Sequence, residues 1–134
     1  AAQRMDCELT LSEGLDELNF GAWVGLTPEA IWERDPDLIQ HWWQQPMRFV
    51  APEGESMDRF IQRVRLDWEL LRDNYLTGRI LVITHANAIR VILADVLQIP
   101  YVKTQRINID YAAISRIKVH ASGEMTLISH GLIE

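Results

Sequence analysis

Cysteine, basic residues and long apolar runs are all scarce in this sequence. Cys7 is the only cysteine among 134 residues, which excludes an internal disulfide and favours a cytoplasmic location. No apolar run exceeds four residues, as at 80–83, whereas a membrane-spanning helix needs about 20. The 13 basic residues are outnumbered by 19 acidic ones, and the net charge is −6. We therefore expect neither nucleic acid nor a membrane surface as a partner.

Motifs for metals and cofactors are also missing. His41, His120 and His130 share no metal-ligand spacing with one another or with Cys7, which argues against a zinc site. The sequence has no glycine-rich phosphate loop, no Gly-x-Ser-x-Gly nucleophile motif and no paired cysteine motif. We therefore expect no metal and no cofactor.

The composition that is present is typical of one folded domain. Hydrophobic residues make up 48% of the chain and charged residues 24%, a balance that favours a packed core over disorder. No repeat or linker interrupts the sequence, so we expect residues 1–134 to form a single domain. The chain begins Ala1-Ala2-Gln3-Arg4, without the features of a signal peptide. We expect this start to lie within an element of a longer protein.

Helical periodicity is clearest over residues 56–76. An apolar stripe runs along this segment through Met57, Phe60, Ile61, Val64, Trp68 and Leu71, and Ser56 is the expected N-cap. Further helices are expected at 27–34, with Thr27 as N-cap and Pro28 in the first turn, and at 37–45 and 88–97. Residues 1–8 are expected to end another helix.

Residues 79–84 are predicted to form a strand in the interior of a sheet. Four bulky apolar residues stand together at 80–83, which is typical of an interior strand covered on both faces. Two antiparallel strands are expected at 111–119 and 124–129, joined at 121–123, and a short strand at 7–11. Strands mixed with helices in this order indicate an α/β fold.

The junction between the predicted strand and the helix at 88–97 is a candidate site. Ligands of open α/β sheets collect beyond the carboxyl ends of the strands, and a helix N-terminus attracts anions. His85 lies at this junction and could donate a hydrogen bond to phosphate. It could equally cap the helix or bond a buried carbonyl group, and position alone supports both interpretations.

A second candidate is Glu17, in a predicted turn between apolar residues. Partial burial there would raise the pKa of a carboxyl group towards the range of a general acid, although most acids in such turns are simply solvated. Gly54-Glu55-Ser56 opens the long helix, and Arg63 either pairs with a carboxylate or flanks the apolar stripe. Trp42 and Trp43 are adjacent, so both cannot face one core, and one of them could line a cleft or an interface.

Three motifs, taken in order, resemble the histidine phosphatase superfamily with its phosphoglycerate-mutase-like fold. Residues 17–25 read Glu-Leu-Asn-Phe-Gly-Ala-Trp-Val-Gly, similar to that family's Glu-x-x-aromatic-Gly-x-Trp-x-Gly. Residues 54–56 read Gly-Glu-Ser, followed by Phe60 and Arg63. Residues 82–85 read Val-Ile-Thr-His, followed by Ala88-Ile89-Arg90, and resemble the second-histidine motif. The small bacterial phosphatases typified by α-ribazole-phosphate phosphatase, an enzyme of cobalamin assembly, are the branch most similar.

The resemblance implies a three-layer α/β/α architecture and phosphomonoester hydrolysis through a phosphohistidine. Carried over by position, Glu17 would protonate the leaving alcohol and His85 would stabilise the transferring phosphoryl group. Asn19, Ala86 and Asn87 would contact a small phosphorylated metabolite. The family's mechanism requires no metal.

The chain departs from the family in two ways. It contains no Arg-His-Gly, so the nucleophile, the first strand and a second pocket arginine are expected upstream of Ala1. Ala86-Asn87 stands where the family often has Gly-Gly, so the Asn87 side chain could narrow the pocket or contact substrate.

Two alternative functions remain, namely a non-catalytic domain that binds a phosphorylated ligand and a phosphoglycerate-type mutase. The chain by itself is expected to lack activity and, if it exists alone, to associate with another copy.

Overall fold

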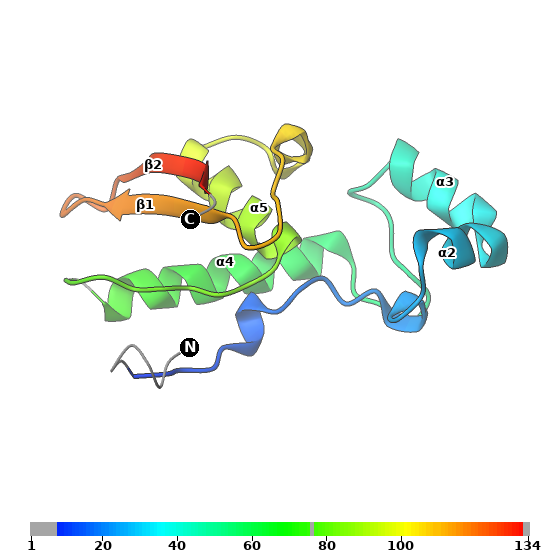
Figure 1. Cartoon of the computed structure of the whole chain (residues 1–134), viewed down its shortest axis with the longest axis horizontal. Helices are drawn as coiled ribbons and strands as arrows, with labels where there is room; N and C mark the ends of the chain where they lie inside the picture. Colours follow the sequence, from blue (N-terminus) through cyan, green and yellow to red (C-terminus); the bar gives the residue numbers. More distant parts are fainter. Residues whose placement is uncertain (1–7, 76, 133–134) are drawn as a thin grey trace.

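The computed structural model describes residues 8–75 and 77–132, which are mostly helical with one small sheet (Figure 1). In chain order the elements are η1 (Glu13–Leu15), η2 (Gly21–Trp23), α2 (Pro28–Arg34), α3 (Pro36–Gln44), α4 (Met57–Asn74), α5 (Ala86–Leu97), η3 (Tyr101–Arg106), β1 (Ile114–Val119) and β2 (Met125–Leu132), where η denotes a 3₁₀ helix. None of the helices in these residues is both long and apolar enough to span a bilayer.

The helix starts follow the predicted caps. The Thr27 hydroxyl accepts a hydrogen bond from the Ala30 N–H at 3.2 Å at the start of α2, and the Ser56 hydroxyl accepts from the Arg59 N–H at 3.3 Å at the start of α4. Each hydroxyl satisfies an amide that has no partner within its helix. The four helices predicted at 27–34, 37–45, 56–76 and 88–97 are confirmed to within about two residues.

The main core lies between α4 and α5, which pack side by side (Figure 1). The predicted stripe of α4 is buried at Phe60, Ile61 and Val64. It packs with buried residues of α5 that include Val91 and Ile92. The two antiparallel strands are also confirmed: β1 and β2 pair in the predicted order and turn at 120–124. Apolar side chains of this hairpin pack against the same core.

A second, aromatic cluster joins α3 to the loops on either side of it. Trp23 stacks on Phe49 with ring centroids 5.0 Å apart, and Trp42 packs against both rings. Trp43 faces the other way, where it is 69% exposed and stacks on Trp32. The two adjacent tryptophans therefore serve different surfaces, as their spacing predicts, and α2 and α3 lie at one end of the molecule, away from the hairpin (Figure 1).

The prediction of a buried strand at 79–84 is wrong for the described residues. Among the described residues, no strand forms hydrogen bonds with this segment. Its side chains are also exposed, Leu81 to 61% and Ile83 to 78%. Residues 8–11 likewise form no strand, and the rest of the helix and strand predicted at 1–11 lies outside the described residues. A strand exists only when a neighbour pairs with its backbone. The three-layer α/β/α architecture is thus not what these residues show, since their only sheet is the β1–β2 pair.

The packing of α4 predicts unequal effects from two aliphatic substitutions. Ile61→Ala, on the buried face, should lower the free energy of unfolding by about 2–5 kcal/mol because it leaves a cavity. Leu66→Ala, on the exposed face of the same helix, should change it by less than about 0.5 kcal/mol. Urea unfolding measures both values. Equal losses would contradict this placement of the helix.

Candidate active site

Glu17 and the motif at the start of α5 meet in space although they lie 70 residues apart in the sequence. One carboxylate oxygen of Glu17 accepts a hydrogen bond from the Leu18 N–H at 2.7 Å. The other accepts from the Asn87 N–H, in the first turn of α5, at 3.2 Å. Glu17 is half-buried between Leu15 and Leu18, which are both buried. The predicted turn between apolar anchors therefore carries the Glu17 carboxyl group to the N-terminus of α5.

His85 is the N-cap residue of α5, but its side chain does not cap the helix. The imidazole is exposed and makes no hydrogen bond or ion pair with the described residues. Neither structural role considered for it from the sequence, capping or bonding a buried carbonyl group, is observed there. Its ring is thus available to a ligand at the N-terminal end of α5.

Tyr101 is a residue of this site that no sequence motif indicated. It is buried in η3, and its hydroxyl donates a hydrogen bond to the Asn87 side-chain oxygen at 3.2 Å. Burial raises the pKa of Tyr101 to about 12, with the Arg90 charge opposing this rise and the Glu17 charge adding to it. The phenol therefore remains a donor throughout the physiological range, and it fixes the orientation of Asn87.

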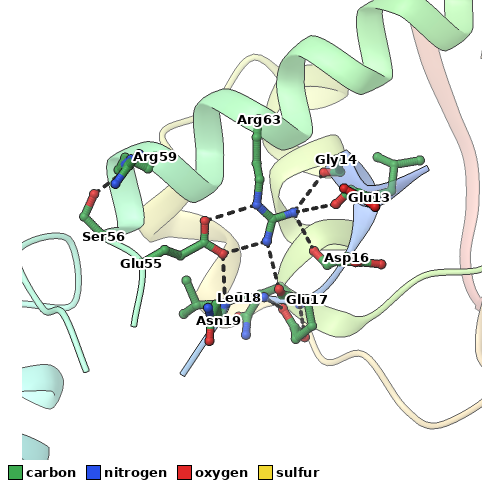
Figure 2. Close-up of polar contacts among 12 residues, drawn as sticks. Glu13, Gly14, Asp16, Glu17, Leu18, Asn19, Glu55, Ser56, Arg59 and Arg63 are labelled. Carbon is green, nitrogen blue, oxygen red and sulfur yellow. Dashed lines mark hydrogen bonds and ion pairs between the residues drawn. The ribbon is translucent and has the colours of Figure 1, made fainter. Parts of the chain in front are cut away.

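The opposite side of the Glu17 loop is fastened to α4 by Arg63 (Figure 2). Its guanidinium donates to the backbone carbonyl oxygens of Glu13, Gly14, Asp16 and Glu17 at 2.8–3.3 Å. The same group binds the Glu55 carboxylate through Nε at 3.1 Å and Nη2 at 2.6 Å. Of the two roles that the sequence left open for Arg63, the pairing with a carboxylate is the one observed, and the four carbonyl contacts are new.

Glu55 extends this connection to Asn19. Its carboxylate accepts a hydrogen bond from the Asn19 N–H at 2.9 Å, and its own N–H donates to the Asn19 carbonyl oxygen at 3.0 Å. Partial burial tends to raise the pKa of the Glu55 carboxyl group, but the hydrogen bonds and the charge of Arg63, with the Asn19 N–H, outweigh it and lower the pKa. Glu55 therefore stays ionised and keeps its pairing with Arg63.

Two glycines allow the loops of these motifs to approach each other. Gly21 has a φ of +49°, and a Cβ atom there would collide with the Pro52 carbonyl oxygen. A Cβ atom at Gly54 would stand 2.6 Å from the Asn19 carbonyl oxygen. The Asn19 side-chain oxygen accepts from the Gly21 N–H at 2.8 Å and so shapes the turn itself.

The structure thus gathers Glu17, Asn87 and Tyr101 in direct contact at the start of α5, with His85 and Ala86 beside them in the chain. Asn19 lies two residues beyond Glu17, where its side chain bonds the backbone of its own turn. Among the residues that the structure describes, no three His, Cys, Asp or Glu side chains gather as metal ligands do. The arrangement offers an anion the positive end of a helix, a histidine ring and a carboxyl group.

Comparisons with known proteins identify the family of the chain. The family model described as Histidine phosphatase superfamily (branch 1) matches residues 1–130. A bifunctional protein of Mycobacterium tuberculosis is 32% identical over 123 residues, which cover 92% of this chain and 34% of that protein. Phosphoserine phosphatase 1 of Hydrogenobacter thermophilus is 23% identical over 116 residues, or 87% of this chain and 55% of that protein.

The fold has a counterpart among solved structures. The crystal structure of the α-ribazole phosphatase from Shigella flexneri superimposes with a TM-score of 0.86 at 18% identity, covering 98% of this chain and 64% of that one. The chain spans less than two thirds of each of these three proteins. Its matched family model and its fold lead to one conclusion: the chain belongs to the histidine phosphatase superfamily, branch 1, and has the phosphoglycerate-mutase-like fold.

Proposed function

We propose that this chain is the C-terminal portion of a phosphatase domain that hydrolyses phosphomonoesters through a phosphohistidine. The observation that carries the proposal is the Glu17 carboxyl group hydrogen-bonded at the N-terminus of α5, the helix whose N-cap residue is His85, an exposed side chain without a hydrogen bond to the described residues. Family membership supports the reaction class. The sequence lacks Arg-His-Gly, so we assign the nucleophile to a segment upstream of Ala1. A strand from that segment would pair with residues 80–83 and complete a three-layer domain.

In the proposed reaction the upstream histidine attacks phosphorus and the ester P–O bond breaks. Glu17 gives its proton to the departing alkoxide, while His85 and the first-turn amides of α5 other than that of Asn87, which binds Glu17, stabilise the charge on the equatorial oxygens. Water then attacks the phosphohistidine and loses a proton to Glu17, which releases inorganic phosphate and restores the acid. A carboxyl group at the edge of an anion site suits this exchange, because it can give the proton and take it back.

For the substrate we propose a small phosphorylated metabolite, with α-ribazole phosphate as the first candidate to test. The structural similarity to an α-ribazole phosphatase motivates that choice, whereas a relative named phosphoserine phosphatase makes phosphoserine the second. We assign Asn19, Ala86 and Asn87 to substrate binding, Asn87 through the amide that Tyr101 orients. The single cysteine is in keeping with a cytoplasmic enzyme of this kind.

One observation favours a second candidate, a domain that binds a phosphorylated ligand without turning it over. The site described above needs no nucleophile to attract an anion, and none is identified in the chain. The sequence of the gene upstream of Ala1 separates the two candidates. An Arg-His-Gly after an apolar strand supports the enzyme, and its absence supports the binding domain. Transfer of phosphate to a hydroxyl acceptor, measured against release of inorganic phosphate, tests the mutase alternative.

Replacement of His85 tests its role in the proposed reaction. His85→Ala in the intact protein should remove most phosphatase activity and leave the unfolding midpoint unchanged, because the ring is exposed and makes no hydrogen bond with the described residues. His41→Ala, another exposed histidine placed on α3, is the matched control and should keep full activity. Turnover of His85→Ala at the wild-type rate would contradict the assignment.

Replacement of Glu17 tests the general acid. Glu17→Gln should slow the hydrolysis of alkyl phosphates by about 10²–10⁴-fold, and of nitrophenyl phosphate far less, because nitrophenolate leaves without a proton. Asp16→Asn, which removes the exposed neighbouring carboxylate, should leave both rates unchanged. Equal losses on the two substrates would show that Glu17 has a positioning or structural role instead.

The chain alone provides a third test. Residues 1–134 by themselves should release no phosphate from nitrophenyl phosphate, because neither Glu17 nor His85 replaces the nucleophile. The exposed apolar segment at 80–83 should also make this piece associate, which light scattering measures. An active monomer would overturn the proposed mechanism and require one of the other histidines as nucleophile.

A further inference from the structure

The Arg63 guanidinium commits all of its donors to one loop and to Glu55. A guanidinium has five N–H bonds in a fixed plane. Those of Nη1 point to the carbonyl oxygens of Glu13, Gly14 and Asp16. The remainder go to Glu17 O and to both Glu55 oxygens. All the hydrogen bonds of this group therefore go to residues 13–17 and to Glu55.

These contacts hold the backbone on both sides of Glu17. Arg63 binds the carbonyl groups of Asp16 and Glu17 at 3.0 and 2.8 Å. Glu55, held by the same guanidinium, binds the Asn19 N–H at 2.9 Å. The Glu17 side chain therefore projects from a stretch of backbone fixed before, at and after it (Figure 2). Its carboxylate reaches the Asn87 N–H only if that backbone keeps its place.

The anchor itself is rigid. Arg63 stands on α4 between Phe60 and Val64, neither of which has any exposed surface. Its guanidinium lies 5.0 Å from the centre of the Phe60 ring, which supports it from one side. The Arg63 and Glu55 side chains are only 28% and 16% exposed, so their contacts are better shielded from water than a surface ion pair. The loop is thus tied to a well-packed helix rather than to another loop.

From this geometry we propose that Arg63, together with Glu55, is the positioning residue that sets the Glu17 carboxyl group at the N-terminus of α5. The proposal rests on the role of Glu17 in the proposed function. It requires the planar fork of arginine, because one ammonium group cannot serve four carbonyl oxygens and a carboxylate at once. Arg63→Lys keeps the positive charge but loses the planar group, so it should not hold Glu17 in position.

The test compares Arg63→Lys with Arg63→Gln in the intact protein, and Arg65→Lys serves as the matched control on the exposed face of α4. Both Arg63 variants should lower kcat on an alkyl phosphate such as glycerol phosphate by about tenfold to a hundredfold, as expected for a displaced catalytic group. The kcat for nitrophenyl phosphate and the KM values should stay within about twofold. Arg65→Lys should match the wild type on both substrates.

A second measurement does not depend on activity. Amide hydrogen exchange at Leu18 and Asn87, the two donors to Glu17, should accelerate in Arg63→Lys and not in Arg65→Lys. Combining Arg63→Lys with Glu55→Gln should add little to the loss in kcat, because the two side chains act as one unit.

Each outcome decides the proposal. An Arg63→Lys variant with the wild-type ratio of alkyl to aryl rates and unchanged exchange would overturn it. Equal losses on both substrates, in step with the folded fraction, would also overturn it, because they indicate a structural role alone. If the wild-type protein hydrolyses no phosphomonoester while Arg63→Lys still accelerates exchange at Leu18 and Asn87, the proposed function fails and the positioning of Glu17 by Arg63 stands.

Discussion

The bonding of one guanidinium to four backbone carbonyl groups is the interaction on which the candidate site depends. Irregular backbone has no ladder of hydrogen bonds to hold it, so its polar groups must find partners elsewhere. Four carbonyl oxygens of residues 13–17 find theirs in Arg63, which collects them around a single cation. Glu55 balances that cation and extends the contact to Asn19. Besides this pair, the segment is joined to α4 by the Ser12 hydroxyl, which donates to the Asp67 carboxylate, and by the packing of Leu15 and Leu18 in the core.

Other contacts of the site also hold the irregular backbone around Glu17 in place. Gly21 and Gly54 let the Asn19 turn and the loop before α4 approach within hydrogen-bond distance. The turn leads directly into the aromatic cluster around Trp23 and Phe49. Thr84 closes the other side, where its hydroxyl donates to the Leu15 carbonyl oxygen. The Glu17 segment is therefore bound by α4 on one side and by the approach to α5 on the other.

A partial positive charge and a carboxyl group meet at the start of α5. The helix brings partial positive charge and has no acidic residue in its first turn. The carboxyl group of Glu17 enters from another segment, at the edge of this positive end rather than on the helix. Tyr101 contributes a neutral donor that stays protonated, because its burial disfavours the phenolate. The positive end of α5 and the carboxyl group of Glu17 thus lie together, with His85 directly before the helix in the chain.

The helices, the hairpin and the three motifs could all be predicted from the order of the residues. Helical spacing and caps such as Thr27 and Ser56 act locally, so α2, α4 and β1–β2 follow from nearby residues. Tertiary structure decided what depends on distant partners. Residues 80–83 have the composition of a buried strand, yet no strand pairs with them among the described residues. Tyr101 belongs to no motif and reaches Asn87 only because η3 folds back onto α5. The four carbonyl contacts of Arg63 were equally hidden, because backbone oxygens look the same at every position of a sequence and only the path of the chain brings them to one side chain.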